Sequence, residues 1–100
     1  MTPDGPRLES SISHDGALLL VGEIDSYTAP DLEAMLAERP DGCVVDLAGV
    51  AFIDSSGLRV IVEAHRQREG RGGVTLRSPN PAVQRVFEIS GVTDRLPFAG

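Results

Sequence analysis

The sequence contains one cysteine, no tryptophan and only four other aromatic residues in 100 positions. Because Cys43 has no second cysteine to pair with, an intramolecular disulfide and a cysteine-based metal cluster are both excluded. No apolar run approaches the ~20 residues that a membrane-spanning helix needs. Residues 1–6 have neither the basic nor the apolar segment of a signal peptide. We therefore expect a cytoplasmic protein that holds no metal and no cofactor.

Basic residues are also few, with nine Lys and Arg against fifteen Asp and Glu, and the net charge is −6. Nucleic-acid binding depends on Lys and Arg that neutralise phosphates, so this charge argues against a nucleic-acid partner. It also argues against an anionic membrane surface. A chain of this length makes one ordinary domain, and we expect a soluble monomer or a weak dimer.

Short apolar segments of strand length recur along the chain. Residues 17–21 form a continuous apolar run, which predicts a strand covered on both faces of its sheet. The alternation of apolar and polar residues over positions 8–12 predicts a half-buried strand. A hairpin at residues 14–16 joins it to the strand at residues 17–21. Pro97 confines the last expected strand to an edge. The remaining strands are expected at residues 43–47, 74–76 and 96–98.

Three helices fit between these strands. Thr28 opens the first, with Asp31 three residues later in an arrangement close to a capping box. The second spans about residues 56–69, and the arginines of residues 66–71 are expected on a solvated helix end. Asn80 caps the third. Helices that connect strands in the order β-β-α-β-α-β-α-β predict an α/β fold with a mixed, mostly parallel sheet and helices packed against it.

The most informative segment is Phe52-Ile53-Asp54-Ser55-Ser56-Gly57-Leu58, where a buried strand ends and a helix begins. Asp, Ser and Gly are residues that helix N-caps prefer, so a purely structural role is one interpretation. The other is phosphorylation of an exposed hydroxyl, because the N–H groups and dipole of a helix start tolerate negative charge. A phosphate on Ser55 would add about −1.5 to −2 charges at pH 7. We expect it to leave the fold intact and to weaken a protein interface over the site.

A serine hydrolase is a weaker interpretation of the same segment. The sequence has no G-x-S-x-G elbow, and neither histidine has a recognisable placement for activating Ser55.

Several motifs occur in order along the chain and at suitable intervals. Together they resemble the STAS domain, in particular that of bacterial anti-sigma factor antagonists, over about residues 8–98. The motifs are Val21-Gly22-Glu23-Ile24-Asp25, Thr28-Ala29-Pro30, Val45-Asp46-Leu47, Phe52-Ile53-Asp54-Ser55-Ser56-Gly57-Leu58, and Ser78-Pro79-Asn80-Pro81-Ala82-Val83 followed by Phe87 and Ser90-Gly91.

The resemblance implies a single STAS-like domain at residues 7–100, behind a flexible tail at residues 1–6. It implies a phosphoprotein that takes part in partner switching. The unphosphorylated antagonist binds an anti-sigma factor serine kinase and frees a sigma factor. The kinase then phosphorylates Ser55, which switches the antagonist off, and a PP2C-type phosphatase resets the cycle. Such a protein regulates sigma-factor-dependent transcription in a stress response and is not an enzyme itself.

The resemblance also names the surroundings of this phosphoacceptor. Asp54 lies beside Ser55 and could orient its hydroxyl, and Asp25 is expected near the same surface. Ser56 and Gly57 match the neighbouring motif positions, with a capping role for Ser56. Other STAS domains are accessory subunits of transporters or lipid-transport ATPases, and this alternative stays open.

Overall fold

The computed structural model of the protein describes residues 8–99, which contain five strands and three helices in the expected order. The α/β fold is therefore confirmed, whereas the tail predicted at residues 1–6 lies outside the described residues. Among these residues no helix has the length and the apolar character needed to cross a bilayer. The elements are β1 (Leu8–Ile12), β2 (Leu18–Ile24), α1 (Ala29–Ala37), β3 (Cys43–Ile53), α2 (Ser55–Gln67), β4 (Val74–Arg77), α3 (Pro81–Ile89) and β5 (Phe98–Ala99).

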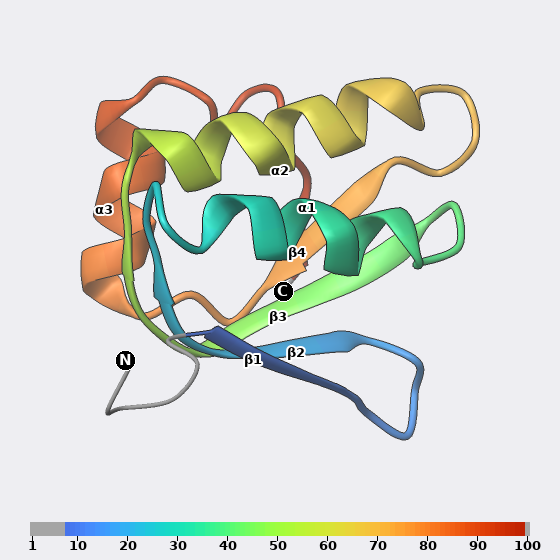
Figure 1. The fold of residues 1–100 in the computed structure, drawn as a ribbon. Helices are drawn as coiled ribbons and strands as arrows, with labels where there is room; N and C mark the ends of the chain where they lie inside the picture. The colour runs from blue at the N-terminus through green and yellow to red at the C-terminus, as the bar shows by residue number, and fades with distance from the viewer. Residues whose placement is uncertain (1–7, 100) are drawn as a thin grey trace.

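The five strands form one mixed sheet in the order β1-β2-β3-β4-β5. β1 pairs antiparallel with β2, and the other pairs are parallel, with β5 at the edge that Pro97 predicted. Right-handed crossovers that always step the same way along a sheet place every connecting helix on the same face. Figure 1 shows this arrangement, with α1 and α2 side by side over the sheet and α3 at one end.

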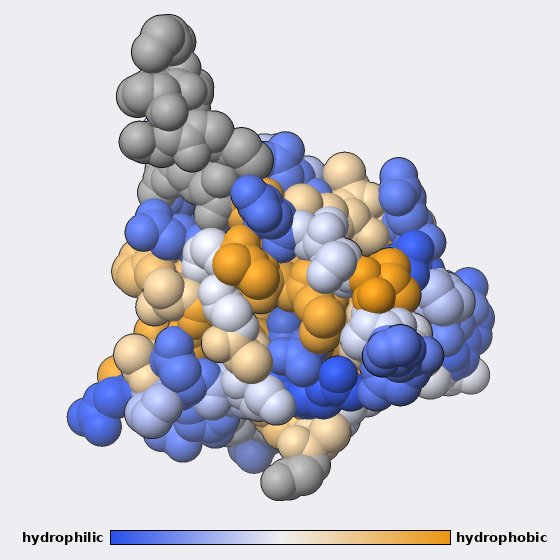
Figure 2. Space-filling model, turned by 90° about the horizontal axis from the view of Figure 1, so that it is seen from below, coloured by the Kyte–Doolittle hydropathy of each residue, from blue (hydrophilic) through white to orange (hydrophobic). Residues whose placement is uncertain are grey.

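The core lies between that face and the helices. It contains alternate side chains of the strands and the apolar faces of the helices, with Phe87 fully buried and packed edge-on against Phe98 at 5.3 Å between ring centroids. The strand at residues 17–21 is not covered on both faces, so that prediction is wrong. Leu18 and Leu20 are buried, but Val21 is 56% exposed. Figure 2 shows the uncovered face of the sheet, on which apolar side chains are exposed to solvent.

The start of α1 also differs from the prediction. Thr28 is its N-cap, but the Thr28 side chain makes no capping hydrogen bond. Its hydroxyl instead donates to the carbonyl of Glu23 and accepts from the N–H of Asp25, both at 2.9 Å. The predicted capping box is therefore wrong, because the Thr28 hydroxyl binds backward to the end of β2. For α3 the predicted cap is confirmed, since Asn80 Oδ1 accepts from the N–H of Val83 at 2.8 Å.

The end of α2 is solvated only in part. Arg66 and Arg71 are exposed, as expected, but Arg68 is buried at 7% exposure. The Arg68 guanidinium donates to the carbonyls of Leu36 at 2.7 Å, Arg39 at 3.2 Å and Ala64 at 3.2 Å. It therefore joins the carboxyl ends of α1 and α2, where carbonyls lack the i+4 N–H partner of a helix interior.

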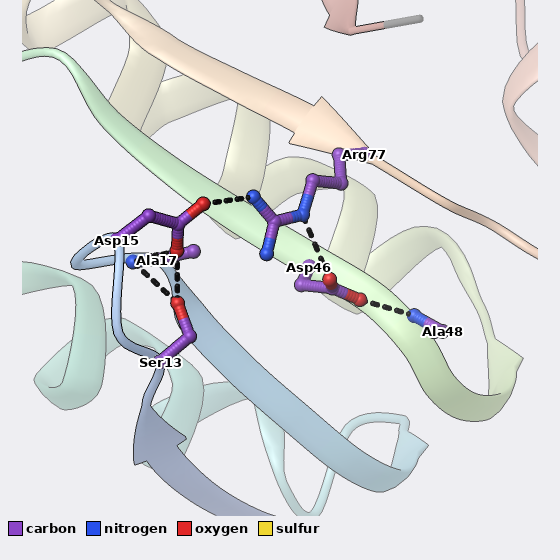
Figure 3. A network of polar contacts seen from close by, with 6 residues as sticks. All are labelled: Ser13, Asp15, Ala17, Asp46, Ala48 and Arg77. Atoms are coloured by element: carbon purple, nitrogen blue, oxygen red, sulfur yellow. Dashed lines mark hydrogen bonds and ion pairs between the residues drawn. The ribbon is translucent and has the colours of Figure 1, made fainter.

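A second arginine holds the uncovered face together (Figure 3). Arg77 on β4 donates to Asp46 on β3 at 2.8 Å and to Asp15 in the β1–β2 hairpin at 2.7 Å. The Ser13 hydroxyl and the Ala17 N–H also donate to Asp15. These hydrogen bonds, that of Arg77 first, hold the pKa of Asp15 well below its usual range. The network ties the hairpin to the centre of the sheet.

Candidate functional site

The site begins with Asp54, which links the end of β3 to α2. Its extended backbone, with φ −120° and ψ −173°, lets the side chain turn back over the helix start. Oδ1 accepts from the N–H groups of Ser56 at 2.9 Å and Gly57 at 3.4 Å. The Asp54 N–H itself donates to the carbonyl of Ile24 at 3.1 Å. Asp54 is therefore the N-cap of α2 and also anchors the helix start to the end of β2.

The two serines of the motif differ in exposure. Ser55 is the first residue of α2 and is exposed, whereas Ser56 is half-buried. Among the described residues the Ser55 side chain makes no hydrogen bond. The cap comes from the Asp54 side chain, which accepts from the Ser56 N–H. The capping role expected for Ser56 therefore belongs to Asp54. Ser55 is therefore the more exposed of the two serines.

Gly57 is fixed by the close approach of α2 to the sheet. A Cβ at this position would lie 2.3 Å from Cγ2 of Ile24 and 2.9 Å from Cγ1 of Ile53. Real Cβ atoms do not approach heavy atoms so closely, so a side chain would push the helix start outward. The glycine therefore sets how near Ser55 sits to the ends of β2 and β3.

Asp25 lies on the same edge of the sheet, as predicted. It follows β2, whose last residue Ile24 pairs with Ile53 at the end of β3. The half-buried Asp25 carboxylate accepts from the N–H groups of Tyr27 at 2.9 Å and Thr28 at 3.1 Å, which shapes the turn into α1. Asp25 and Asp54 thus perform matching tasks at neighbouring strand ends.

Sequence reasoning missed a groove that runs between the first turns of α1 and α2. It encloses about 240 Å³ and is lined by Ser26, Ala29, Pro30, Glu33, Ser56, Arg59 and Val60. Tyr27, next to Ser26 in the chain, is 82% exposed. Arg59 is also exposed. The sequence alone could have indicated it, because a residue four positions after Ser55 lies on the same face of a helix. The site is therefore an open surface with a shallow groove.

Two other residues that the sequence offers as candidates, Asp46 and His65, have structural roles elsewhere. Asp46 precedes the end of β3 by seven residues and is engaged by Arg77, so it is not part of the site. His65 accepts a hydrogen bond from the Val74 N–H at its Nδ1, at 2.9 Å, which gives it a packing role. Within residues 8–99 no three His, Cys, Asp or Glu side chains are placed to hold a metal ion together.

Comparison with known proteins gives relatives along nearly the whole chain. A family model described as "Mlab, STAS domain" matches residues 9–97. BtrV of Bordetella bronchiseptica, named as a candidate anti-sigma factor antagonist, is 39% identical over 92 residues, covering 85% of this chain and 79% of BtrV. The anti-sigma-B factor antagonist of Listeria monocytogenes is 35% identical over 82 residues, covering 77% of this chain and 72% of the relative.

Solved structures share the fold. An anti-sigma factor antagonist from Mycobacterium paratuberculosis superposes with a TM-score of 0.74 and 30% identity, covering 97% of this chain and 87% of that chain. The antagonist SpoIIAA in its unphosphorylated form gives a TM-score of 0.70 at 21% identity, covering 93% and 88%. Its phosphorylated form gives 0.63 at 20% identity, covering 93% and 91%. The chain therefore belongs to the STAS domain family, in the group of bacterial anti-sigma factor antagonists.

Proposed function

We propose that this protein binds an anti-sigma factor serine kinase while Ser55 is unmodified and releases it once that kinase has phosphorylated Ser55. The observation that carries the proposal is the division of tasks at the start of α2. Asp54 caps the helix and Gly57 permits its close packing, while the Ser55 hydroxyl is exposed and makes no hydrogen bond among the described residues. The structural neighbour SpoIIAA exists in an unphosphorylated and a phosphorylated form, which supports the same reaction here.

In the phosphorylation reaction this chain contributes only the hydroxyl that accepts the phosphoryl group. The Ser55 oxygen attacks the γ-phosphorus of ATP held by the kinase, and a new O–P bond forms. The bond from that phosphorus to the β–γ bridging oxygen breaks, ADP leaves, and the hydroxyl proton passes to a base of the kinase. A PP2C-type phosphatase reverses the modification by adding water to the phosphorus, which returns the serine and inorganic phosphate. The antagonist supplies the hydroxyl on a rigid helix start and no catalytic group.

The switch works because the phosphate is tolerated by the fold and not by the interface. A helix start favours negative charge by about 0.3–1 kcal/mol, so α2 remains formed. A partner surface packed over Ser55 would instead bury a dianion beside the carboxylates of Asp54 and Asp25. We expect a cost of roughly 3–4 kcal/mol, or a few hundredfold in affinity.

The test uses the purified cognate kinase with labelled ATP. Ser55→Ala should abolish labelling and keep its affinity for the kinase, and Ser55→Asp should lose affinity. Ser56→Ala is the matched control, since it removes the neighbouring hydroxyl and leaves the backbone N–H that Asp54 binds. Normal labelling of Ser55→Ala would show that another residue accepts the phosphate.

A second function is favoured by the uncovered sheet face. Val21 is 56% and Phe52 49% exposed there, and apolar side chains of this kind suit a permanent subunit contact. They fit a STAS accessory subunit of a transporter or lipid-transport ATPase. Such a subunit would bind its partner equally well with Ser55, alanine or aspartate at position 55, so the same binding series separates the two functions.

A further inference from the structure

Arg59 is the basic side chain closest in sequence to Ser55 on α2. It lies four residues later, so the two side chains are neighbours on one face of the helix, with their Cβ atoms about 5–6 Å apart. Helical side chains lean toward the N-terminus and cover the turn before their own Cα. In agreement, Arg59 lines the groove together with Ser56. Its guanidinium therefore reaches over the first turn of α2.

Arg59 is not engaged by another side chain in the described structure. Arg59 is exposed, and within the described part of the chain it makes no hydrogen bond or ion pair. Glu63, one turn further along α2, is already engaged by Arg66 at 3.0 and 2.6 Å and by Gln67 at 3.2 Å. Arg59 is thus available to a new anion on its N-terminal side.

Three carboxylates lie at this end of α1, α2 and β2. Asp54 precedes Ser55, Asp25 ends the neighbouring strand, and Glu33 lines the groove that Arg59 also lines. The other arginines of α2 and the loop after it lie at the far end of the helix. Of the arginines on α2, Arg59 is therefore the one within a turn of a phosphate on Ser55.

We propose that Arg59 binds the phosphoryl group of phosphorylated Ser55 across one turn of α2. The planar guanidinium can donate two hydrogen bonds to phosphoryl oxygens, which a lysine cannot do in the same geometry. The pairing offsets repulsion from Asp54 and Asp25. It also draws Arg59 away from the groove, so phosphorylation adds a dianion to the docking surface and withdraws a free cation from it. This inference relies on the proposed function only for Ser55 as the modified residue.

The test places phosphoserine at position 55 during translation, so that it needs no kinase. A ³¹P NMR titration then measures the second ionisation of the phosphate. We expect the pKa of this phosphate to be lower by roughly half a pH unit in the parent than in Arg59→Gln, because a nearby cation favours the dianion. Arg59→Lys should retain part of the effect. Arg66→Gln, at the far end of α2 and away from Ser55, is the matched control and should titrate like the parent.

A second measurement guards against a purely local effect of charge. The Nε–H resonance of Arg59 should move on phosphorylation in the parent, while that of Arg66 stays in place. If Arg59→Gln titrates like the parent and the Arg59 resonance does not move, the pairing is refuted. Because the phosphate is installed directly, that outcome says nothing against phosphorylation by the kinase. Failure of the kinase to label Ser55 would in turn leave the titration result standing.

Discussion

Arg68 offers the sharpest test of how this fold is held together. Its guanidinium is buried and donates to the carbonyls of Leu36, Arg39 and Ala64. Replacing Arg68 by methionine keeps much of the side-chain volume and removes all three donors. The expected result is a large loss of stability, because carbonyls at the carboxyl ends of α1 and α2 would lose partners where water has little access.

The size of the loss follows from the contacts. A hydrogen bond from a charged donor contributes about 1.5–3 kcal/mol. The three bonds share one group and do not add, and the buried Arg68 Nε has no hydrogen-bond partner in the described structure, which offsets part of the gain. The half-exposed Asp41 carboxylate at 3.8 Å adds little. We expect a net loss of about 2–4 kcal/mol and, at ~5 °C per kcal/mol for a domain of about 100 residues, a Tm lower by roughly 10–20 °C.

The assay is thermal and urea unfolding followed by far-UV circular dichroism. Arg66→Met is the matched control on the same helix, since the Arg66 side chain is 63% exposed and, within residues 8–99, forms its ion pair with Glu63. Loss of that surface pair should cost at most about 1 kcal/mol. If Arg68→Met unfolded within about 3 °C of Arg66→Met, the stabilising role of the buried guanidinium would be refuted.

Three further predictions concern the site and the sheet. Asp54→Ala should lose about 1 kcal/mol in urea unfolding through the missing cap, while Asp54→Asn, which can still accept, should stay within a few tenths; equal losses would contradict capping. Gly57→Ala should lose about 1–3 kcal/mol in the same assay by crowding Ile24, and an unchanged midpoint would contradict that packing. The pKa of Asp15 is lowered in the folded protein, mainly by the hydrogen bond from Arg77. The contribution of Asp15 to folding stability is therefore fully present above about pH 4, the unfolded pKa, and is lost as the pH falls toward the folded pKa. The Tm gap between the parent and Asp15→Asn should therefore be wide at pH 7 and narrow at pH 2.5; a constant gap would disprove the linkage.

Local patterns were sufficient to predict the order of the helices and strands. Asn80 followed by Pro81 predicted the start of α3. The Asn80 side chain can accept from a free N–H of the first turn, and proline suits the first helical position because it has no N–H that would need a partner. Pro97 predicted an edge strand, because proline has no N–H to donate to a second neighbouring strand. The motif at residues 54–57 predicted the start of α2, because Asp, Ser and Gly are residues that helix N-caps prefer.

Features that depend on long-range geometry could not be predicted. The apolar run at residues 17–21 looks the same whether one or both faces of its strand are covered. The difference depends on strand order, which decides the side on which each crossover helix lies. Arg68 could not be singled out either, because its acceptors Leu36 and Arg39 lie 32 and 29 residues earlier in the chain. From sequence it resembles its exposed neighbours Arg66 and Arg71.

Helix capping and the proposed phosphorylation concern different residues of the motif. Asp54 and Gly57 carry structural tasks, so changing either one alters the helix start before it alters any interface. Ser55 carries none among the described residues, so its hydroxyl can be modified at little cost to the scaffold. A switch needs a group whose change is felt by the partner and hardly by the fold. In the proposed switch Ser55 is that group, and Arg59, exposed one turn away on α2, is the residue that we propose responds to the added charge.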